Sequence, residues 1–283
     1  MITNLFEKII GHLMIIYRRT PLPSAKIGKF LAKVLVLCLK PNNKRVIKEV
    51  NGVTFKLDLS QVIDMSLYLS GTFEENVEKI IGAKLQPGMI AFDIGANIGY
   101  HTFRMANLVS ETGKVFAIEP AGWAYERLII NSSLNPKIKN IEFIKVGLAG
   151  GDFGFKNMCF QSSYRLDGRN ESINEVIEII TLDTLIRRRK IEKVNFIKLD
   201  VDGFESKVIE GAINTLSLMK PTLLMEINPS EILKQEGSID KMIHILLSCG
   251  YQFRTEREVE IFNLDLYCRE NYLTSTMIIG EVV

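Results

Sequence analysis

The sequence predicts an α/β fold in which a mostly parallel sheet carries helices on both faces. Three observations favour this fold. From residue 89 onward, short apolar runs alternate with segments of helical periodicity, which is typical of parallel strands joined by helices. Hydrophobic residues make up 47% and charged residues 24% of the 283 residues, a composition that supports a packed core and argues against global disorder. A loop rich in small residues follows the first apolar run, as in sheets that bind nucleotides.

The first 60 residues predict an extension ahead of a sheet domain that spans residues 61–283. Two amphipathic helices are predicted on either side of residues 20–24 (TPLPS), because the two prolines break the helical pattern. Residues 45–60 predict a β-hairpin, since apolar and polar residues largely alternate around Asn51-Gly52, a dipeptide that suits a type I′ turn.

The predicted helices of residues 1–45 are basic as well as amphipathic. Residues 1–50 contain ten Lys and Arg but two Glu. Apolar stripes bordered by cations fit either helices docked on the folded domain, which we favour, or a peripheral contact with the inner face of a membrane. No run approaches the ~20 apolar residues of a membrane-spanning helix. We see no signal peptide and no paired cysteine pattern, so we expect a cytoplasmic protein with free thiols.

The elements of the sheet domain follow in chain order. A helix is predicted through 73–85 and ends before Pro87-Gly88. Apolar runs predict seven main strands, at 89–94, 114–120, 141–149, 194–200, 221–228, 251–256 and 271–280. An added strand is predicted at 175–183. Helical periodicity predicts helices at 98–109, 122–134, 203–218 and 239–250. This order predicts a Rossmann-like domain with a seven-stranded sheet.

The segment FDIGANIGYHT (92–102) is the strongest indication of a ligand site. It would end a strand at Asp93 and then expose backbone N–H groups at the start of a helix, where small residues let a ligand approach: Gly95, Ala96, Asn97 and Gly99. Dinucleotide-binding loops require glycine at their third and sixth positions, which are Asn97 and Tyr100 here. A nicotinamide-dependent oxidoreductase is therefore disfavoured.

Two carboxylates favour a different adenosine ligand. Asp93 would repel a pyrophosphate but suits an ammonium group, such as the one at the methionine end of S-adenosylmethionine. Glu119 lies 20 residues after Gly99 and ends the next strand, where a carboxylate can accept hydrogen bonds from both ribose hydroxyls. The pair predicts S-adenosylmethionine as cofactor; the alternative is a structural turn with an unrelated Glu. His101 and Gly147 complete the predicted cofactor-binding residues.

A second group of carboxylates follows the strand at 194–200. Asp200 ends that strand, and Asp202 and Glu205 come directly after it. Ligands bind outside the carboxyl ends of the strands in such sheets, so Asp200 and Asp202 are the predicted catalytic residues, as substrate-orienting groups or as general base. For Asp202, capping of a helix that begins near Gly203 is an equally weighted alternative.

A metal site is a less favoured interpretation of the same region. Glu226 and Asn228 end the fifth main strand and could join Asp200 in an oxygen-rich site. Carboxylates at strand ends are common without a metal, however, so no metal is predicted.

Several motifs together resemble the FkbM-type methyltransferases. They stand in that family's order over residues ~70–230: SGTFEENVEKI (70–80), LQPGMIAFDIGANIGYHT (85–102), VFAIEP (115–120), ITLDTL (180–185), NFIKLDVDGFESKVIEGA (195–212) and LLMEINP (223–229). The resemblance implies a class I methyltransferase fold and O-methylation of a hydroxyl group. The chain departs from the family pattern at Asp202, where the family has Glu.

These observations predict an S-adenosylmethionine-dependent methyltransferase that O-methylates a hydroxyl of a sugar, glycan or glycolipid. The alternatives are a small natural-product acceptor and a non-catalytic nucleotide-binding scaffold. No nucleic-acid partner is expected. The sequence leaves the identity of the acceptor, the oligomeric state and the choice of base between Asp200 and Asp202 open.

Overall fold

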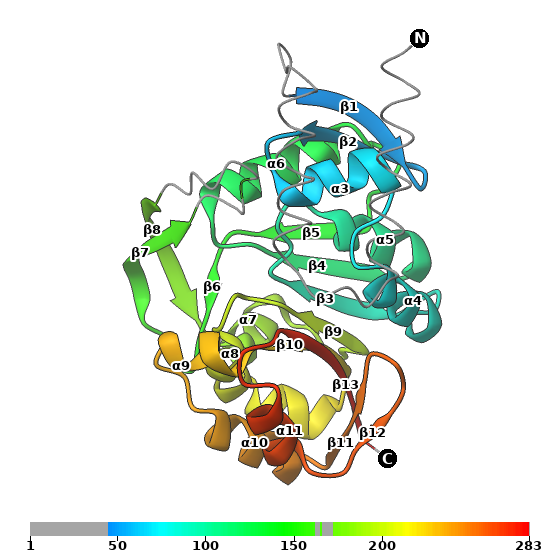
Figure 1. Cartoon of the computed structure of the whole chain (residues 1–283). Coiled ribbons are helices and arrows are strands. Elements are labelled where there is room, and N and C mark those ends of the chain that lie inside the picture. Colours follow the sequence, from blue (N-terminus) through cyan, green and yellow to red (C-terminus); the bar gives the residue numbers. More distant parts are fainter. Residues whose placement is uncertain (1–44, 162–164, 166–171, 283) are drawn as a thin grey trace. The chain divides into compact units, whose positions relative to one another are not determined.

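The computed structural model describes residues 45–161, 165 and 172–282 (Figure 1). The predicted helices of residues 1–45, and with them the membrane contact, lie outside the described residues apart from Arg45. The chain divides into two compact units. The described part of the smaller unit lies within 45–75, 133–135 and 159–174, and the larger unit contains 76–132, 136–158 and 175–282. The predicted boundary between residues 60 and 61 stays a prediction.

The smaller unit contains the predicted hairpin. Strands β1 (Arg45–Val50) and β2 (Val53–Asp58) pair in antiparallel register, with Val50 opposite Val53. Asn51 and Gly52 have φ values of 52° and 79°, the two positive values that a type I′ turn requires. Helix α3 (Val62–Ser70) follows. The side chain of Asn135 bonds both the N–H and the carbonyl of Thr54, and thereby fixes one edge of β2.

The larger unit is built on one sheet with the strand order β12-β11-β13-β10-β9-β3-β4-β5. The parallel strands are β3 (Ile90–Ile94), β4 (Lys114–Ile118), β5 (Ile141–Ile144), β9 (Phe196–Leu199) and β10 (Thr222–Ile227). The antiparallel part comprises β11 (Tyr251–Thr255), β12 (Glu260–Ile261) and β13 (Thr276–Val282). The mostly parallel sheet is confirmed, but it has eight strands and not seven, because the short strand β12 extends its edge.

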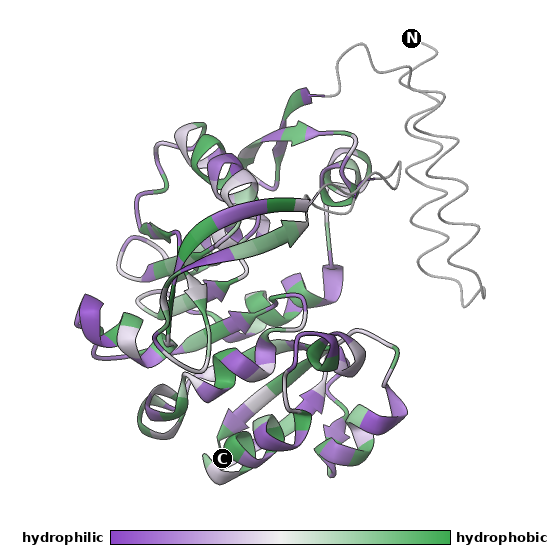
Figure 2. Ribbon diagram, turned by 90° about the vertical axis from the view of Figure 1, so that its left-hand side faces the viewer, coloured by the Kyte–Doolittle hydropathy of each residue, from purple (hydrophilic) through white to green (hydrophobic). Residues whose placement is uncertain are grey.

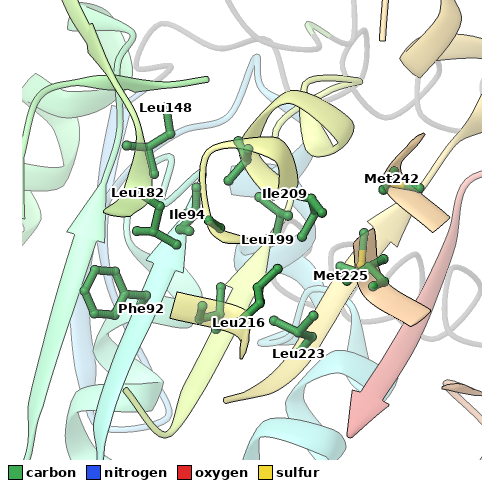
Figure 3. Packing of buried hydrophobic residues seen from close by; sticks show 14 of the residues in the cluster. Phe92, Ile94, Leu148, Leu182, Leu199, Ile209, Leu216, Leu223, Met225 and Met242 are labelled. Atoms are coloured by element: carbon green, nitrogen blue, oxygen red, sulfur yellow. The ribbon is translucent and has the colours of Figure 1, made fainter. Parts of the chain in front are cut away.

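Helices cover both faces of this sheet. Residues of α4 (Glu75–Lys84) and α5 (Tyr100–Val109) pack on one face against Ala91, Val115, Phe196 and Leu224. The other face carries a larger core with side chains from α7 (Leu182–Arg189), α8 (Glu205–Glu210), the π-helical turn Thr215–Met219, α9 (Pro229–Lys234), α10 (Ile239–Ser248) and α11 (Leu264–Glu270) (Figure 3). The helices carry both hydrophilic and hydrophobic residues (Figure 2), as expected of elements with one buried face.

The predicted strand at 141–149 is wrong as a single element. β5 ends at Ile144, and the next residues form β6 (Gly147–Leu148), which pairs in parallel with β8 (Ser172–Ile180). A strand that the sequence did not reveal, β7 (Gly154–Gln161), completes this second sheet in the order β6-β8-β7. Although the chain leaves the main sheet after β5, Val146 and Leu148 still bury their side chains in the same core.

Two further boundaries differ from the sequence prediction for local reasons. The predicted strand at 175–183 ends at Ile180, because the Thr181 side chain accepts a hydrogen bond from the Thr184 N–H and begins α7. The predicted helix at 203–218 is interrupted after Glu210. The next residue must be glycine, because a Cβ at Gly211 would overlap the carbonyl oxygen of Ala149. Over the part of the chain that the structure describes, no helix combines the length and apolarity needed to cross a membrane.

Candidate active site

The glycine loop lies where the strand order reverses, between β3 and β9. From β3 the chain proceeds to β4 and β5 on one side, and it later returns to β9 and β10 on the other. Ligands of open α/β sheets bind at such a switch point, outside the carboxyl ends of the strands. The amides of Gly95 and Ala96 both donate to the carbonyl of Ile118, each at 3.0 Å, and anchor the loop to the end of β4.

Glycine is required in this loop for packing, a reason that the sequence did not reveal. Gly95 and Gly99 have φ values of 86° and 93°, which other residues adopt only at a cost. A Cβ at Gly95 would overlap the carbonyl oxygen of Asp200, and one at Gly99 would overlap Leu128 of α6 (Gly122–Ser133). The loop is thus pressed against the end of β9, so substitution of Gly95 would disturb the fold as well as any ligand.

Glu119 is buried at the end of β4 and tied to the loop. Its carboxylate accepts the N–H of Asn97 at 2.8 Å and the N–H of Ala121 at 2.9 Å. Burial raises the pKa of Glu119 to about 7, because it outweighs these two bonds, and the charges of Asp202 and Asp93 add to the increase. Each carboxylate oxygen can accept a further hydrogen bond, so the predicted contacts with ribose hydroxyls fit this geometry.

A buried ion-pair cluster joins β3 to β9. Asp93 accepts a hydrogen bond from Thr102 Oγ1 through Oδ2 at 2.5 Å, and its Oδ1 lies 3.9 Å from Lys198 Nζ. The same ammonium group donates to Asp200 Oδ2 at 3.0 Å. Sequence reasoning missed Lys198, which stands in the apolar run NFIKLD; the only available signal was that a lysine interrupts a buried strand.

Asp200 forms the acidic centre of the site. Burial opposes its ionisation, but the ammonium of Lys198, and then the nearby His101, outweigh burial and lower the pKa of Asp200. Asp200 also interacts with Glu226 at the end of β10. Burial, followed by the charge of Asp200, raises the pKa of Glu226 to about 8, and Ser275 Oγ donates to Glu226. At neutral pH an ionised Asp200 therefore lies beside a protonated Glu226.

The turn after Asp200 corrects the helix-capping interpretation of Asp202. Helix α8 begins at Glu205 and not near Gly203, and its cap residue makes no side-chain hydrogen bond. The buried Glu205 instead accepts the N–H groups of Val201 and Gly203. Asp202 is exposed in this turn with φ 51°, an uncommon conformation for a residue other than glycine.

The remaining predicted residues fall in different places. His101 is buried in the first turn of α5 and interacts with Asp200. Gly147 lies in β6, where its nearest side-chain neighbours are Ile177 and Ile179. Asn228 caps α9, because its Oδ1 accepts bonds from the Glu231 N–H and from Ser230 Oγ, which leaves it poorly placed as a metal ligand. Among the described residues no group of three His, Cys, Asp or Glu side chains is arranged to hold a metal ion.

Comparison with known families now identifies the family of this chain. The model of the methyltransferase FkbM domain matches residues 93–253, more than half of the chain, from Asp93 at the glycine loop to Phe253 in β11. The chain belongs to the FkbM methyltransferase family. It is accordingly an S-adenosylmethionine-dependent methyltransferase, as the sequence predicted.

Proteins similar to this chain include a relative of known activity and several solved structures. A hexuronic acid methyltransferase, AglP of Haloferax volcanii, is 27% identical over 176 residues, which cover 60% of this chain and 70% of that protein. Among solved structures, the FkbM methyltransferase of Methylobacillus flagellatus is 15% identical with a TM-score of 0.41, covering 76% of this chain and 52% of its own. An Aquifex aeolicus methyltransferase is 14% identical with a TM-score of 0.41, covering 74% and 90%.

Proposed function

We propose that this FkbM methyltransferase transfers the methyl group of S-adenosylmethionine to a hydroxyl group of a sugar, most naturally a hexuronic acid residue in a glycan or glycolipid. One observation carries the proposal: Asp93, Glu119 and Asp200 lie at the carboxyl ends of three adjacent parallel strands, Asp93 one residue before the end of β3, and surround the switch point of the sheet. The relative that acts on a hexuronic acid supports a sugar acceptor.

The donor side of the site fits the cofactor at two atoms. Glu119 is fixed by backbone N–H groups and can still accept hydrogen bonds from ribose hydroxyls. Within the described part of the chain Asp93 Oδ1 is buried without a hydrogen bond, an acceptor suited to an ammonium group. The remaining proposed cofactor contacts are the loop residues Gly95, Ala96, Asn97 and Gly99, together with His101 and Gly147.

On the acceptor side, Asp200 is the proposed catalytic residue. S-adenosylmethionine supplies a methyl group on a sulfonium that is already a good leaving group. A new C–O bond forms as the C–S bond breaks, and the hydroxyl proton must pass to a base. Asp200 can receive that proton because its carboxylate is held ionised beside Lys198. The exposed Asp202 is proposed to orient the acceptor, since the protein gains most by aligning the two reactants.

The site charge favours a hydroxyl over the carboxylate of a hexuronic acid as the methylated group. Asp200 and Asp202 would repel an acceptor carboxylate brought to the same position, whereas they accept hydrogen bonds from a hydroxyl. The chemistry of the products separates the two cases, since a hydroxyl gives a methyl ether and a carboxylate gives a methyl ester.

The test uses purified full-length protein, radiolabelled S-adenosylmethionine, and a panel of uronic acid glycosides, neutral glycosides and phenolic natural products. We expect label in a uronic acid glycoside that resists mild alkali, as an ether does. Alkali-labile label would indicate a methyl ester and would contradict methylation of a hydroxyl group. Label confined to phenols would contradict a sugar acceptor, and a protein that fails to bind S-adenosylhomocysteine would contradict the proposed donor site.

A further inference from the structure

We propose that Lys198 is a positioning residue for methyl transfer, whose buried ammonium group holds the carboxylates of Asp93 and Asp200 in one arrangement. It would thereby couple the loop that binds the methyl donor to the side chain that serves the acceptor. The inference rests on the proposed donor and acceptor sites and adds a residue that contacts neither reactant.

The sheet register brings the three residues together. Asp93 and Lys198 are direct partners in the parallel pair of β3 and β9, so their side chains leave the sheet on the same face. Asp200 lies two residues beyond Lys198 and shares that face, because side chains alternate along a strand. The distances agree: Lys198 Nζ is 3.0 Å from Asp200 Oδ2 and 3.9 Å from Asp93 Oδ1.

The burial of Lys198 indicates that its charge is required. Its side chain is 2% exposed and that of Asp93 is 1% exposed, whereas Asp200 is 28% exposed and can reach an acceptor. Lysine is seldom buried unless it is paired. The strand neighbours of Lys198 on this face are apolar, namely Phe196 before it and Leu224 beside it on β10. An apolar side chain would suit a purely structural position here better than an ammonium group.

The other ionisable groups around Asp200 come from four elements. His101 approaches from α5 and Glu226 from β10, while Glu205 lies in α8 and Asp202 in the turn before it. With Asp93, these make five ionisable groups beside Lys198 or Asp200, and four of the five are acids. The ammonium group of Lys198 therefore offsets a local excess of acidic side chains. If Lys198 lost its charge, the like charges of Asp93 and Asp200 on the same face of the sheet would no longer be compensated, which disfavours the ionisation of both together.

The test measures S-adenosylhomocysteine binding by calorimetry, which needs no knowledge of the acceptor. Wild type is compared with Lys198→Met and with Lys114→Met at pH values from about 6 to about 9. Lys114 is a matched control, because it also pairs with a carboxylate, Glu142 at 2.6 Å, but starts β4 at the opposite end of the sheet and is 42% exposed. The result for each variant is the ratio of its dissociation constant for S-adenosylhomocysteine to that of wild type at the same pH.

For Lys198→Met we expect a ratio of about 10 or more near pH 6 that falls as pH rises, because the two uncompensated carboxylates can ionise together more readily at higher pH. For Lys114→Met we expect a ratio near one throughout. A Lys198→Met ratio that stays near one, or that is raised equally at every pH, would overturn the inference. If Lys198→Met does not fold, Lys198→Gln, which keeps a donor for Asp200, carries the same expectation. Wild-type protein that binds no S-adenosylhomocysteine would contradict the proposed function and not this inference.

Discussion

Two acidic regions of the larger unit look alike in sequence and differ in chemistry. ITLDTL (180–185) and IKLDVDGFE (197–205) each place an aspartate after an apolar strand. Asp183 accepts four hydrogen bonds, from the backbone and side chains of Asn214 and Thr215. Near Asp200, by contrast, Glu205 Oε2 and Asp93 Oδ1 are buried without a hydrogen bond from the described residues. A carboxylate saturated by backbone and side-chain donors builds the fold, whereas carboxylates left short of donors at a switch point are available for a ligand.

The largest difference between the two regions is expected in turnover. Asp200→Asn removes the charge that receives the acceptor proton at nearly constant volume. We expect methyl transfer to fall by about 100-fold or more, with S-adenosylhomocysteine affinity changed far less. Initial rates and calorimetry on the same preparation measure both quantities. Normal turnover in Asp200→Asn would leave the residue a structural role only.

Asp183→Asn should show the reverse pattern. Its four hydrogen bonds join α7 to the turn at Thr215, two at each carboxylate oxygen. Asparagine has one acceptor oxygen, so two of these bonds lose their acceptor. We expect the free energy of unfolding in urea to fall by about 2 kcal/mol, while the turnover of the folded enzyme stays within about twofold of wild type. A selective loss of turnover at full stability would remove the distinction between the regions.

Backbone strain offers a third way to separate a site position from a neutral one. Gly95 and Gly154 both have positive φ, 86° and 65°. A Cβ at Gly95 would overlap the backbone of Asp200, whereas a Cβ at Gly154 meets nothing within 4 Å. Gly154→Ala should therefore cost about 1 kcal/mol of stability and leave S-adenosylhomocysteine binding intact. Gly95→Ala should cost more and weaken binding as well; thermal denaturation and calorimetry test both, and equal effects in the two variants would contradict this packing argument.

The smallest expected effect is a dependence of stability on pH with opposite signs in the two regions. Burial raises the pKa values of Glu119 and Glu205 to about 7, above the ordinary glutamate value of 4.5. Their stabilising effect is complete below about 4.5 and is lost as pH rises through about 7. Backbone and side-chain bonds from Thr181 and Thr184 lower the pKa of Asp152, so its contribution is lost only as pH falls through that lowered value.

Thermal unfolding against pH should reveal these two contributions. Glu205→Gln should flatten the decrease in melting temperature between about pH 5 and about pH 8. Asp152→Asn should instead alter only the acid side of the profile. If Glu205→Gln leaves the neutral decrease unchanged, the buried carboxyl of Glu205 is not its source.

Much of the fold was predictable because buried parallel strands are continuous apolar runs. The strands β3, β4, β9 and β10 were all predicted within two residues of their ends. The strand β7 was missed because most of its described residues are exposed and the others are only partly buried, which leaves no clear apolar pattern to detect. In the site, Asp93, Glu119 and Asp200 were predictable from their positions at strand ends. Lys198 was not, because only the register of β3 against β9 shows that it faces Asp93.

Tight packing of the glycine loop against β9 has a consequence for protein engineering. The carbonyl of Asp200 already occupies the position that a Cβ at Gly95 would take. The glycine loop proposed to bind the donor therefore cannot be redesigned independently of the segment around Asp200 that is proposed to bind the acceptor. Libraries intended to change acceptor preference should hold residues 95 and 200 fixed and vary exposed positions such as Asp202. Variants selected in this way would keep donor use constant while the acceptor changes.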